Sequence, residues 1–188
     1  MTRAQLAHVL RAAARIANDP QILVIGSQAI LGSYSEDELP DVAWLSIEAD
    51  IAFFDDGGDP SKADTVDGAI GELSQFHDTN AYYAQGVDLM TARLPNGWEG
   101  RLVPFEPPDA NPARARCIEK HDLVISKLVA MREKDREFAD ALIGAGMVDL
   151  AILDARCNQL SGVSPAVVKG VRDWLEAARK RLPRNKRS

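Results

Sequence analysis

Hydrophobic and polar positions divide the chain into a mixed α/β half followed by a helical half. Over residues 2–18 apolar side chains recur every three or four positions, which predicts an amphipathic helix. Residues 22–25 form a short apolar, β-branched run that ends at Gly26, which predicts a buried strand. Residues 47–54 alternate apolar and polar positions, as expected for a strand with one buried face.

The same periodicities predict the remaining elements. We expect a helix that includes Val66 and Ile70 and ends near His77, then strands at residues 90–94 and 101–105 joined by a turn at 95–98. The proline-rich residues 104–115 are interpreted as a connector, and helices are expected at 120–131, 133–145, 148–160 and 165–182. This layout predicts an α/β (α+β) protein with a mixed sheet. Residues 1–110 form its core, and residues 111–188 form a helical lobe packed on that core.

Composition fits one soluble globular domain. The 188 residues are 46% apolar and 27% charged, and the net charge of -6 excludes a uniformly basic nucleic-acid-binding surface. Charge is uneven, because residues 36–67 hold eleven carboxylates and one lysine, whereas residues 169–188 hold eight basic side chains and two acidic ones. This polarity predicts an acidic, cation-binding face and a basic edge or tail suited to a polyanion.

The chain shows no features of a membrane or disulfide-linked protein. No apolar run approaches the roughly 20 residues that span a bilayer, so we expect a cytoplasmic protein without membrane contact. The two cysteines, Cys117 and Cys157, lie forty positions apart and lack the paired spacing of zinc or redox motifs. They are interpreted as buried thiols.

The first candidate for chemistry is the Gly26-Ser27 pair between the first strand and the following helix. Glycine permits close approach of a ligand to the backbone, and free N–H groups at a helix start favour phosphate. The alternative is an ordinary turn in which Ser27 caps the helix.

The second candidate is the pair Glu48 and Asp50, two positions apart on the strand at 47–54. Alternate strand residues project from the same face roughly 6 to 7 Å apart, which suits two carboxylates that bind one or two divalent cations. Their hard oxygen ligands prefer Mg²⁺ or Mn²⁺. The alternative is a solvated polar face.

The third candidate lies in the helical half. Lys127 falls within an apolar helix face, four residues from both Leu123 and Met131, so its amine must extend to solvent or reach a buried anion. Asp135 lies about 80° further round a continuous helix, and a bend near Arg132 is needed to aim both side chains at one pocket. The alternative is a surface network of ion pairs four residues apart.

The order of these motifs resembles a known superfamily. A strand, a Gly-Ser turn, a helix and a strand with an acid-x-acid pair are the pattern of nucleotidyltransferases related to DNA polymerase β. The chain is similar to an uncharacterised bacterial nucleotidyltransferase-like family, over roughly residues 22–142. The stretches that carry the likeness are VIGSQAILGSY, SIEADIAFF, IGELSQFH, YYAQGV, TARLPNGWEGRLV and CIEKHDLVISKLVAMREKDREF. The functionally understood proteins it distantly resembles are AbiEii-type toxin nucleotidyltransferases.

The resemblance implies a nucleotidyltransferase fold and Mg²⁺- or Mn²⁺-dependent transfer of a nucleotide from an NTP to an acceptor. Gly26 and Ser27 would hold the triphosphate, and Glu48 and Asp50 would bind the metals. Among the helical residues, Lys127 and Arg132 would contact phosphates, while Asp135 would act as a base or orient the acceptor. The toxin-like relatives imply an RNA or tRNA acceptor and an antitoxin protein as partner.

A third carboxylate, usual in the superfamily, is not identified. None of Asp88, Glu106 and Asp122 can be placed on the metal side from the sequence. Two alternatives therefore stay open beside the enzyme: a catalytically silent nucleotide- or RNA-binding protein on the same fold, and an antitoxin-like subunit that binds no nucleotide.

Overall fold

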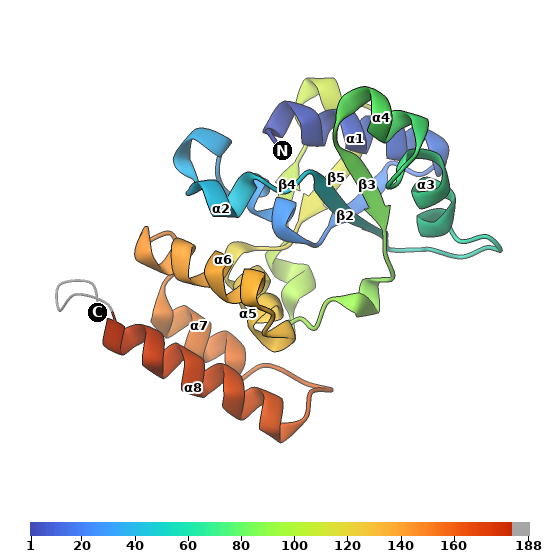
Figure 1. Ribbon diagram of the computed structural model, residues 1–188. Coiled ribbons are helices and arrows are strands. Elements are labelled where there is room, and N and C mark those ends of the chain that lie inside the picture. The colour runs from blue at the N-terminus through green and yellow to red at the C-terminus, as the bar shows by residue number, and fades with distance from the viewer. Residues whose placement is uncertain (182–188) are drawn as a thin grey trace.

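A five-stranded mixed sheet forms the centre of the computed structural model, which describes residues 1–181 (Figure 1). The strand order is β3-β2-β1-β5-β4. Strand β1 pairs antiparallel with β2 and parallel with β5, β3 runs parallel to β2, and β4 runs antiparallel to β5. The strands are β1 (Gln21–Val24), β2 (Glu48–Phe53), β3 (Tyr83–Gly86), β4 (Val103–Phe105) and β5 (Arg114–Cys117). The predicted α/β class with a mixed sheet is confirmed.

Helices cover both sides of this sheet. Helices α1, α3 and α4 lie on one side, and α5 to α8 lie on the other, with α8 packed against α7 and α5 (Figure 1). The α-helices are α1 (Arg3–Ile16), α2 (Asp41–Trp44), α3 (Lys62–Ile70), α4 (Gln75–Asn80), α5 (Lys120–Ala130), α6 (Glu133–Gly144), α7 (Leu150–Cys157) and α8 (Pro165–Arg181). The 3-10 helices are η1 (Ser27–Gly32), η2 (Glu36–Glu38), η3 (Leu89–Thr91), η4 (Trp98–Arg101) and η5 (Pro108–Ala110).

The core is built from the apolar stripes that the sequence predicted. Leu6 and Leu10 of α1 are fully buried, and a Thr2–Gln5 capping box satisfies the first N–H groups of that helix. Ile22 and Val24 of β1 are also fully buried, because β1 lies in the middle of the sheet. Each such side chain contributes about 1.5–3 kcal/mol by leaving water, so the central strand is a firm base for the turn that follows it.

Two strands differ from their expected places. The strand expected at residues 90–94 is instead the 3-10 helix η3, and the sheet takes the earlier segment Tyr83–Gly86 as β3. Strand β5 overlaps only the end of the expected connector, at Arg114 and Ala115, and lies between β1 and β4. The sheet therefore ends after Cys117 rather than at residue 110. Strand β5 was not expected from the sequence, because its outward positions are arginines and because several prolines precede it.

The two long helical segments around residue 131 are separated by a sharp break. Helix α5 ends with Met131 in the left-handed conformation, at φ 56°, and the Met131 N–H donates to the Lys127 carbonyl at 2.9 Å. Arg132 then takes an extended conformation as the N-cap of α6. This is the bend that the sequence required if Lys127 and Asp135 were to meet.

No helix within residues 1–181 is both long and apolar enough to cross a bilayer. The last part of the expected basic tail, residues 182–188, lies outside the described residues.

Candidate functional site

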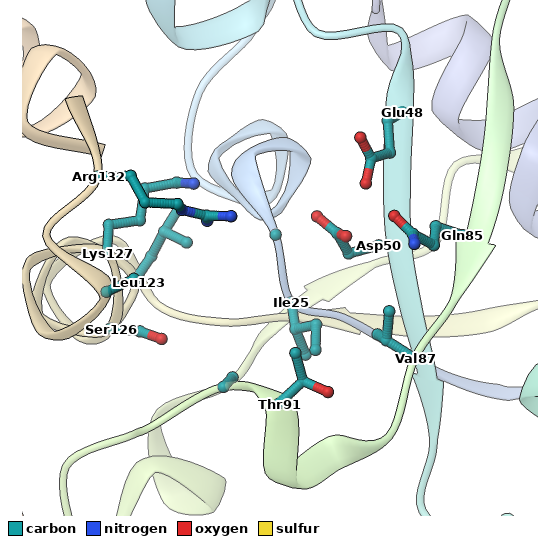
Figure 2. A pocket seen from close by; sticks show the side chains of 13 residues that line it. Ile25, Glu48, Asp50, Gln85, Val87, Thr91, Leu123, Ser126, Lys127 and Arg132 are labelled. Atoms are coloured by element: carbon teal, nitrogen blue, oxygen red, sulfur yellow. The ribbon is translucent and has the colours of Figure 1, made fainter. Parts of the chain in front are cut away.

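A cavity of ≈ 290 Å³ opens between the sheet and helix α5 (Figure 2). Its walls come from the turn after β1, the outer faces of β2 and β3, the η3 segment, and the end of α5. The lining residues are Ile25, Gly26, Glu48, Asp50, Gln85, Val87, Thr91, Ala92, Leu123, Ser126, Lys127, Ala130 and Arg132. Segments more than eighty residues apart in sequence thus share one hollow.

The acidic wall is built by strand alternation on β2. Ala49 and Ile51 are fully buried on the core side, so Glu48 and Asp50 project into the cavity (Figure 2). The parallel neighbour β3 places Tyr83 beside Glu48 and Gln85 beside Asp50. The Tyr83 hydroxyl donates a long hydrogen bond to Glu48 Oε2 at 3.5 Å, and burial, followed by the charge of Glu48, raises the pKa of Tyr83 to about 12. Tyr83 therefore stays a donor.

Asp50 is held in an environment that disfavours its charge. Burial, and then the neighbouring Glu48 carboxylate, raise the pKa of Asp50 to about 6, although the positive charges of Lys127 and Lys134 act in the opposite direction. Two half-buried carboxylates at close range repel each other, and a shared divalent cation would remove that repulsion. Mg²⁺ suits the pair, since it is usually bound by one or two carboxylates and completes its shell with water and phosphate oxygens.

Gly26 is required by the close approach of Asp50. A Cβ atom on Gly26 would lie 1.4 Å from Asp50 Oδ2, closer than any non-bonded contact allows. The Ile25 N–H donates to the Asp50 carbonyl at 3.0 Å, which fixes the two backbones side by side. Glycine at this position thus lets the β1 turn and the acidic wall share one end of the cavity.

Ser27, the other half of the expected pair, begins η1 but is not among the residues that line the cavity. The helix that follows the turn is a 3-10 helix of six residues. The next residue, Gln28, is fully buried, and its Nε2 donates to the Ser46 carbonyl at 2.9 Å, which ties η1 to the segment just before β2. Gln28 was not expected from the sequence, where its only signal is an amide next to apolar residues.

The opposite wall is cationic. Lys127 from the last turn of α5 and Arg132 from the α5–α6 break point across the cavity toward Asp50 and Glu48 (Figure 2). Asp135 binds both cations from behind and is fully buried, but it does not line the cavity. The structure therefore brings together Gly26, Glu48, Asp50, Lys127 and Arg132, and it places Ser27 and Asp135 outside this hollow.

None of the three residues considered as a third acid reaches the cavity. Asp88 is exposed and caps η3, Glu106 is exposed, and Asp122 is buried in an ion pair with Arg101. Within residues 1–181 no group of three or more His, Cys, Asp or Glu side chains is arranged to hold a metal ion. The neutral amide of Gln85 occupies the strand position beside Asp50 (Figure 2).

The rest of the lining is mainly apolar and comes partly from the segment after β3, which was not expected from the sequence to reach the site. Val87 and Ala92 follow β3, and Leu123 lies on α5, while Thr91 and Ser126 add hydroxyl groups. The signal for Gln85 and Val87 was the alternation in YYAQGV, but that stretch was not assigned to a strand. The cavity thus has a charged end and an apolar end.

The basic character expected near the C-terminus is largely neutralised on α8. Lys169 pairs with Asp173, and Lys180 pairs with Glu176, both at spacing i to i+4. Two arginines of the same helix pair with acids of neighbouring helices, namely Arg179 with Asp154 and Arg181 with Asp140. Paired side chains of this kind offer little free charge to a polyanion.

Comparison with protein families adds a classification to this geometry. The model of a family described as nucleotidyltransferase of unknown function (DUF6036) matches residues 4–169, which is most of the chain. The chain belongs to this family. Searches of curated proteins and of solved structures find no match.

The residues matched by this nucleotidyltransferase family run from α1 into α8, so they include every residue that lines the cavity. The expected nucleotidyltransferase-like character is confirmed at the level of the family. The finer similarity to AbiEii-type toxins is not shown by the match. The family description names no substrate, so the choice of reaction rests on the residues themselves.

Proposed function

We propose that this chain transfers a nucleotide from an NTP to an acceptor, with Mg²⁺ held by Glu48 and Asp50. The observation that carries the proposal is the arrangement of two carboxylates and two cations on facing walls of one cavity. A divalent cation fits the acidic wall, and a polyphosphate fits between that cation and the side chains of Lys127 and Arg132.

The division of the cavity matches the parts of a nucleotide. The charged end accommodates a metal-bound triphosphate, and the apolar surface at Ile25 and Val87, below Asp50 in Figure 2, accommodates a nucleoside. Gly26 lines this charged end, and its missing side chain leaves room for the Asp50 carboxylate that would hold the cation. In the transfer, an acceptor hydroxyl forms a bond to the α-phosphorus and loses its proton to water, while the bond to the β-phosphate oxygen breaks and pyrophosphate leaves.

The chain's own residues contribute mainly by positioning and charge. Bound Mg²⁺ would supply neutralisation of the triphosphate charge. Lys127 and Arg132 stabilise the negative charge that develops on the departing pyrophosphate. RNA, with tRNA as one example, is our proposed acceptor, and a toxin role beside an antitoxin protein is proposed with it. Both rest on the resemblance to AbiEii-type toxins.

A catalytically silent nucleotide-binding protein is the second candidate. The observation in its favour is Gln85, whose neutral amide stands beside Asp50 where a further carboxylate would strengthen cation binding. With two acidic ligands, the site can hold a cation and a nucleotide without turning the nucleotide over.

Labelled nucleotides separate these candidates. The full chain is incubated with Mg²⁺, bulk RNA and each NTP, labelled in turn at the α- or the γ-phosphate. Nucleotidyl transfer places the α-label on RNA and leaves the γ-label in pyrophosphate. We expect Asp50→Asn to reduce transfer by about 100-fold or more, while Asp67→Asn, an exposed acid on α3, has no effect.

Each other result has a defined meaning. The α-label on protein instead of RNA would support nucleotidyl transfer and would show that the acceptor is protein and not RNA. Tight NTP binding without transfer by the unaltered chain would establish the silent binder. An unaltered chain that binds neither NTP nor Mn²⁺ would overturn the proposal.

A further inference from the structure

The break between α5 and α6 brings the carboxylate of Asp135 against Lys127. On a continuous helix, residues eight positions apart lie about 80° apart around the axis and about 12 Å apart along it. The left-handed conformation of Met131 and the extended conformation of Arg132 turn α6 back on α5. As a result, Lys127 Nζ donates to Asp135 Oδ1 at 3.2 Å.

The carboxylate of Asp135 accepts hydrogen bonds from the side chains of Lys127 and Arg132. Arg132 Nε donates to Asp135 Oδ2 at 2.6 Å, and a second guanidinium nitrogen donates to Oδ1 at 3.3 Å. The side chain of Asp135 is 0% exposed. Burial opposes its charge, but the hydrogen bonds and charges of Arg132 and Lys127 outweigh burial and hold the pKa of Asp135 below its usual value. A carboxylate so enclosed is poorly placed to take a proton from an acceptor in the cavity.

The two cations, by contrast, face the cavity. Lys127 and Arg132 both line it and point toward the acid pair (Figure 2). The Lys127 amine also lies 5.1 Å from the centre of the Phe138 ring, so α6 contacts it through a carboxylate and an aromatic face. Without Asp135, two like charges at close range would repel each other, and the carboxylates of Glu48 and Asp50, which already act electrostatically on Arg132, face them across the cavity.

We propose that Asp135 is a positioning residue that holds Lys127 and Arg132 on the wall of the cavity, apart from Glu48 and Asp50, so that a cation and a polyphosphate can both enter. This inference rests on the proposed function, and we propose it in place of the expectation that Asp135 acts as a base or orients the acceptor. It follows that loss of the Asp135 charge frees the two cations to pair with the acids. That pairing closes the cavity to both ligands.

The two roles predict different binding. A base acts only in transfer, so its removal leaves ground-state binding intact. A positioning residue acts before transfer, so its removal weakens binding of both the metal and the polyphosphate. Inorganic tripolyphosphate and Mn²⁺ are suitable probes, since neither requires knowledge of the base or the acceptor.

The experiment measures Mn²⁺ binding by electron paramagnetic resonance and tripolyphosphate binding by calorimetry. Asp135→Asn keeps the side-chain volume and removes the charge, and we expect it to weaken both ligands by about tenfold or more. Asp140→Asn is the matched control, because Asp140 lies on the same helix and pairs with Arg181 outside the cavity. We expect the control to bind as the unaltered chain does.

A double-mutant cycle tests whether Asp135 acts through Lys127. If it does, Asp135→Asn has a smaller effect on tripolyphosphate binding in the Lys127→Met background than in the unaltered chain. Should circular dichroism show that Asp135→Asn does not fold, Asp135→Glu takes its place, with an expected weakening of at least about threefold because the longer arm displaces both cations.

The outcomes distinguish this inference from the proposed function. An unaltered chain that binds neither probe contradicts the proposed function. An unaltered chain that binds both, together with a folded Asp135 variant that binds both equally well, contradicts the positioning role and restores Asp135 as a candidate base. Equal effects of Asp135→Asn in both backgrounds also contradict action through Lys127.

Discussion

At the scale of single residues, the site depends on one backbone position without a side chain and one carboxylate with a disfavoured charge. Gly26 and Asp50 meet closely enough that neither can change without affecting the other. Both features lower the stability of the empty protein, because glycine is conformationally free when unfolded and a buried charge costs solvation. Stability and ligand binding should therefore respond in opposite directions to some substitutions.

Gly26→Ala should abolish Mn²⁺ binding. The new methyl group would overlap Asp50 Oδ2, so Asp50 must leave its place or β1 must shift. The matched control is Gly68→Ala in α3, where a Cβ meets no atom within 4 Å and alanine should stabilise the helix by about 0.5–1 kcal/mol. Mn²⁺ titration and urea unfolding of both variants provide the check, and normal Mn²⁺ binding by a folded Gly26→Ala protein would contradict the assigned contact.

Asp50→Asn should stabilise the empty protein at alkaline pH. The pKa of Asp50 is about 6 in the folded chain, against an ordinary value of 3.8 for an exposed Asp side chain. Between these values the folded state binds more protons, so the free energy of unfolding falls as pH rises through this window. Asparagine does not titrate, and its advantage should reach at most about 3 kcal/mol above pH 7.

Urea unfolding at pH 4 and pH 8 measures this difference. The gain of Asp50→Asn should be present at pH 8 and nearly absent at pH 4, while Asp67→Asn should show no such change. A gain that is independent of pH would mean that the charge of Asp50 is not the cause.

At the scale of elements, a buried ion pair attaches the 3-10 helix η4, which precedes β4, to the helical lobe. Asp122 of α5 is 1% exposed; its Oδ2 accepts from Arg101 Nε at 2.7 Å, and its Oδ1 lies 3.1 Å from Arg156 Nε of α7. Three elements, η4, α5 and α7, thus meet at one carboxylate. Since α5 also carries Lys127 and Ser126, the orientation of this helix matters to the cavity.

Asp122→Ala should destabilise the protein by about 3–5 kcal/mol, because it leaves Arg101 and Arg156 without their buried partner. Asp173→Ala on α8 is the comparison, since it breaks an exposed pair with Lys169 that is worth less than about 1 kcal/mol. Chemical denaturation measures both changes. Similar small losses in the two variants would show that the Asp122 cluster does not join these elements.

The sequence predicted the elements whose hydrophobic pattern is long or strongly alternating. Helix α1 and strand β2 lie within one or two residues of their expected ends, and a bend near Arg132 was expected on the condition that Lys127 and Asp135 point at one pocket. Strand β3 was not predicted because its four residues, which end in glycine, are too few to show a clear alternation of apolar and polar positions. Strand β5 was not predicted because its outward positions are Arg114 and Arg116, which do not resemble a strand pattern. In the structure Arg116 packs over the Phe54 ring.

The candidate site was predictable where local spacing determines direction. Alternation on one strand was enough to put Glu48 and Asp50 on the same face. The neighbours of that face depend on strand order, which brings Gln85 beside Asp50 although the two are 35 positions apart. Spacing could likewise not show that Asp135 would be enclosed by Arg132 and Lys127, since that depends on the direction in which α6 leaves the break.

At the scale of the whole molecule, the cavity belongs to both halves of the chain. The acids and Gly26 come from the sheet, whereas Lys127, Ser126 and Leu123 come from α5. Helix α5 also packs on η1, which follows the glycine turn. A helical lobe that separated from the sheet would therefore divide the site.

Unfolding should accordingly be a single transition. Far-ultraviolet circular dichroism reports on all helices, and Trp174 fluorescence in a Trp44→Phe, Trp98→Phe background reports on α8. We expect both signals to give the same urea midpoint, because the buried contacts of α5 couple the halves. Two separate midpoints would show that the helical lobe is an independent domain.

The strand order also bears on how the protein is made. Strand β1 is flanked by β2, which follows it closely in sequence, and by β5, which leaves the ribosome some ninety residues later. A nascent chain that has passed β2 but not Cys117 exposes one open edge of its most apolar strand, an invitation to pair with another polypeptide. Chaperone demand during synthesis should therefore be greatest before translation reaches that cysteine, and it should fall once β5 is inserted.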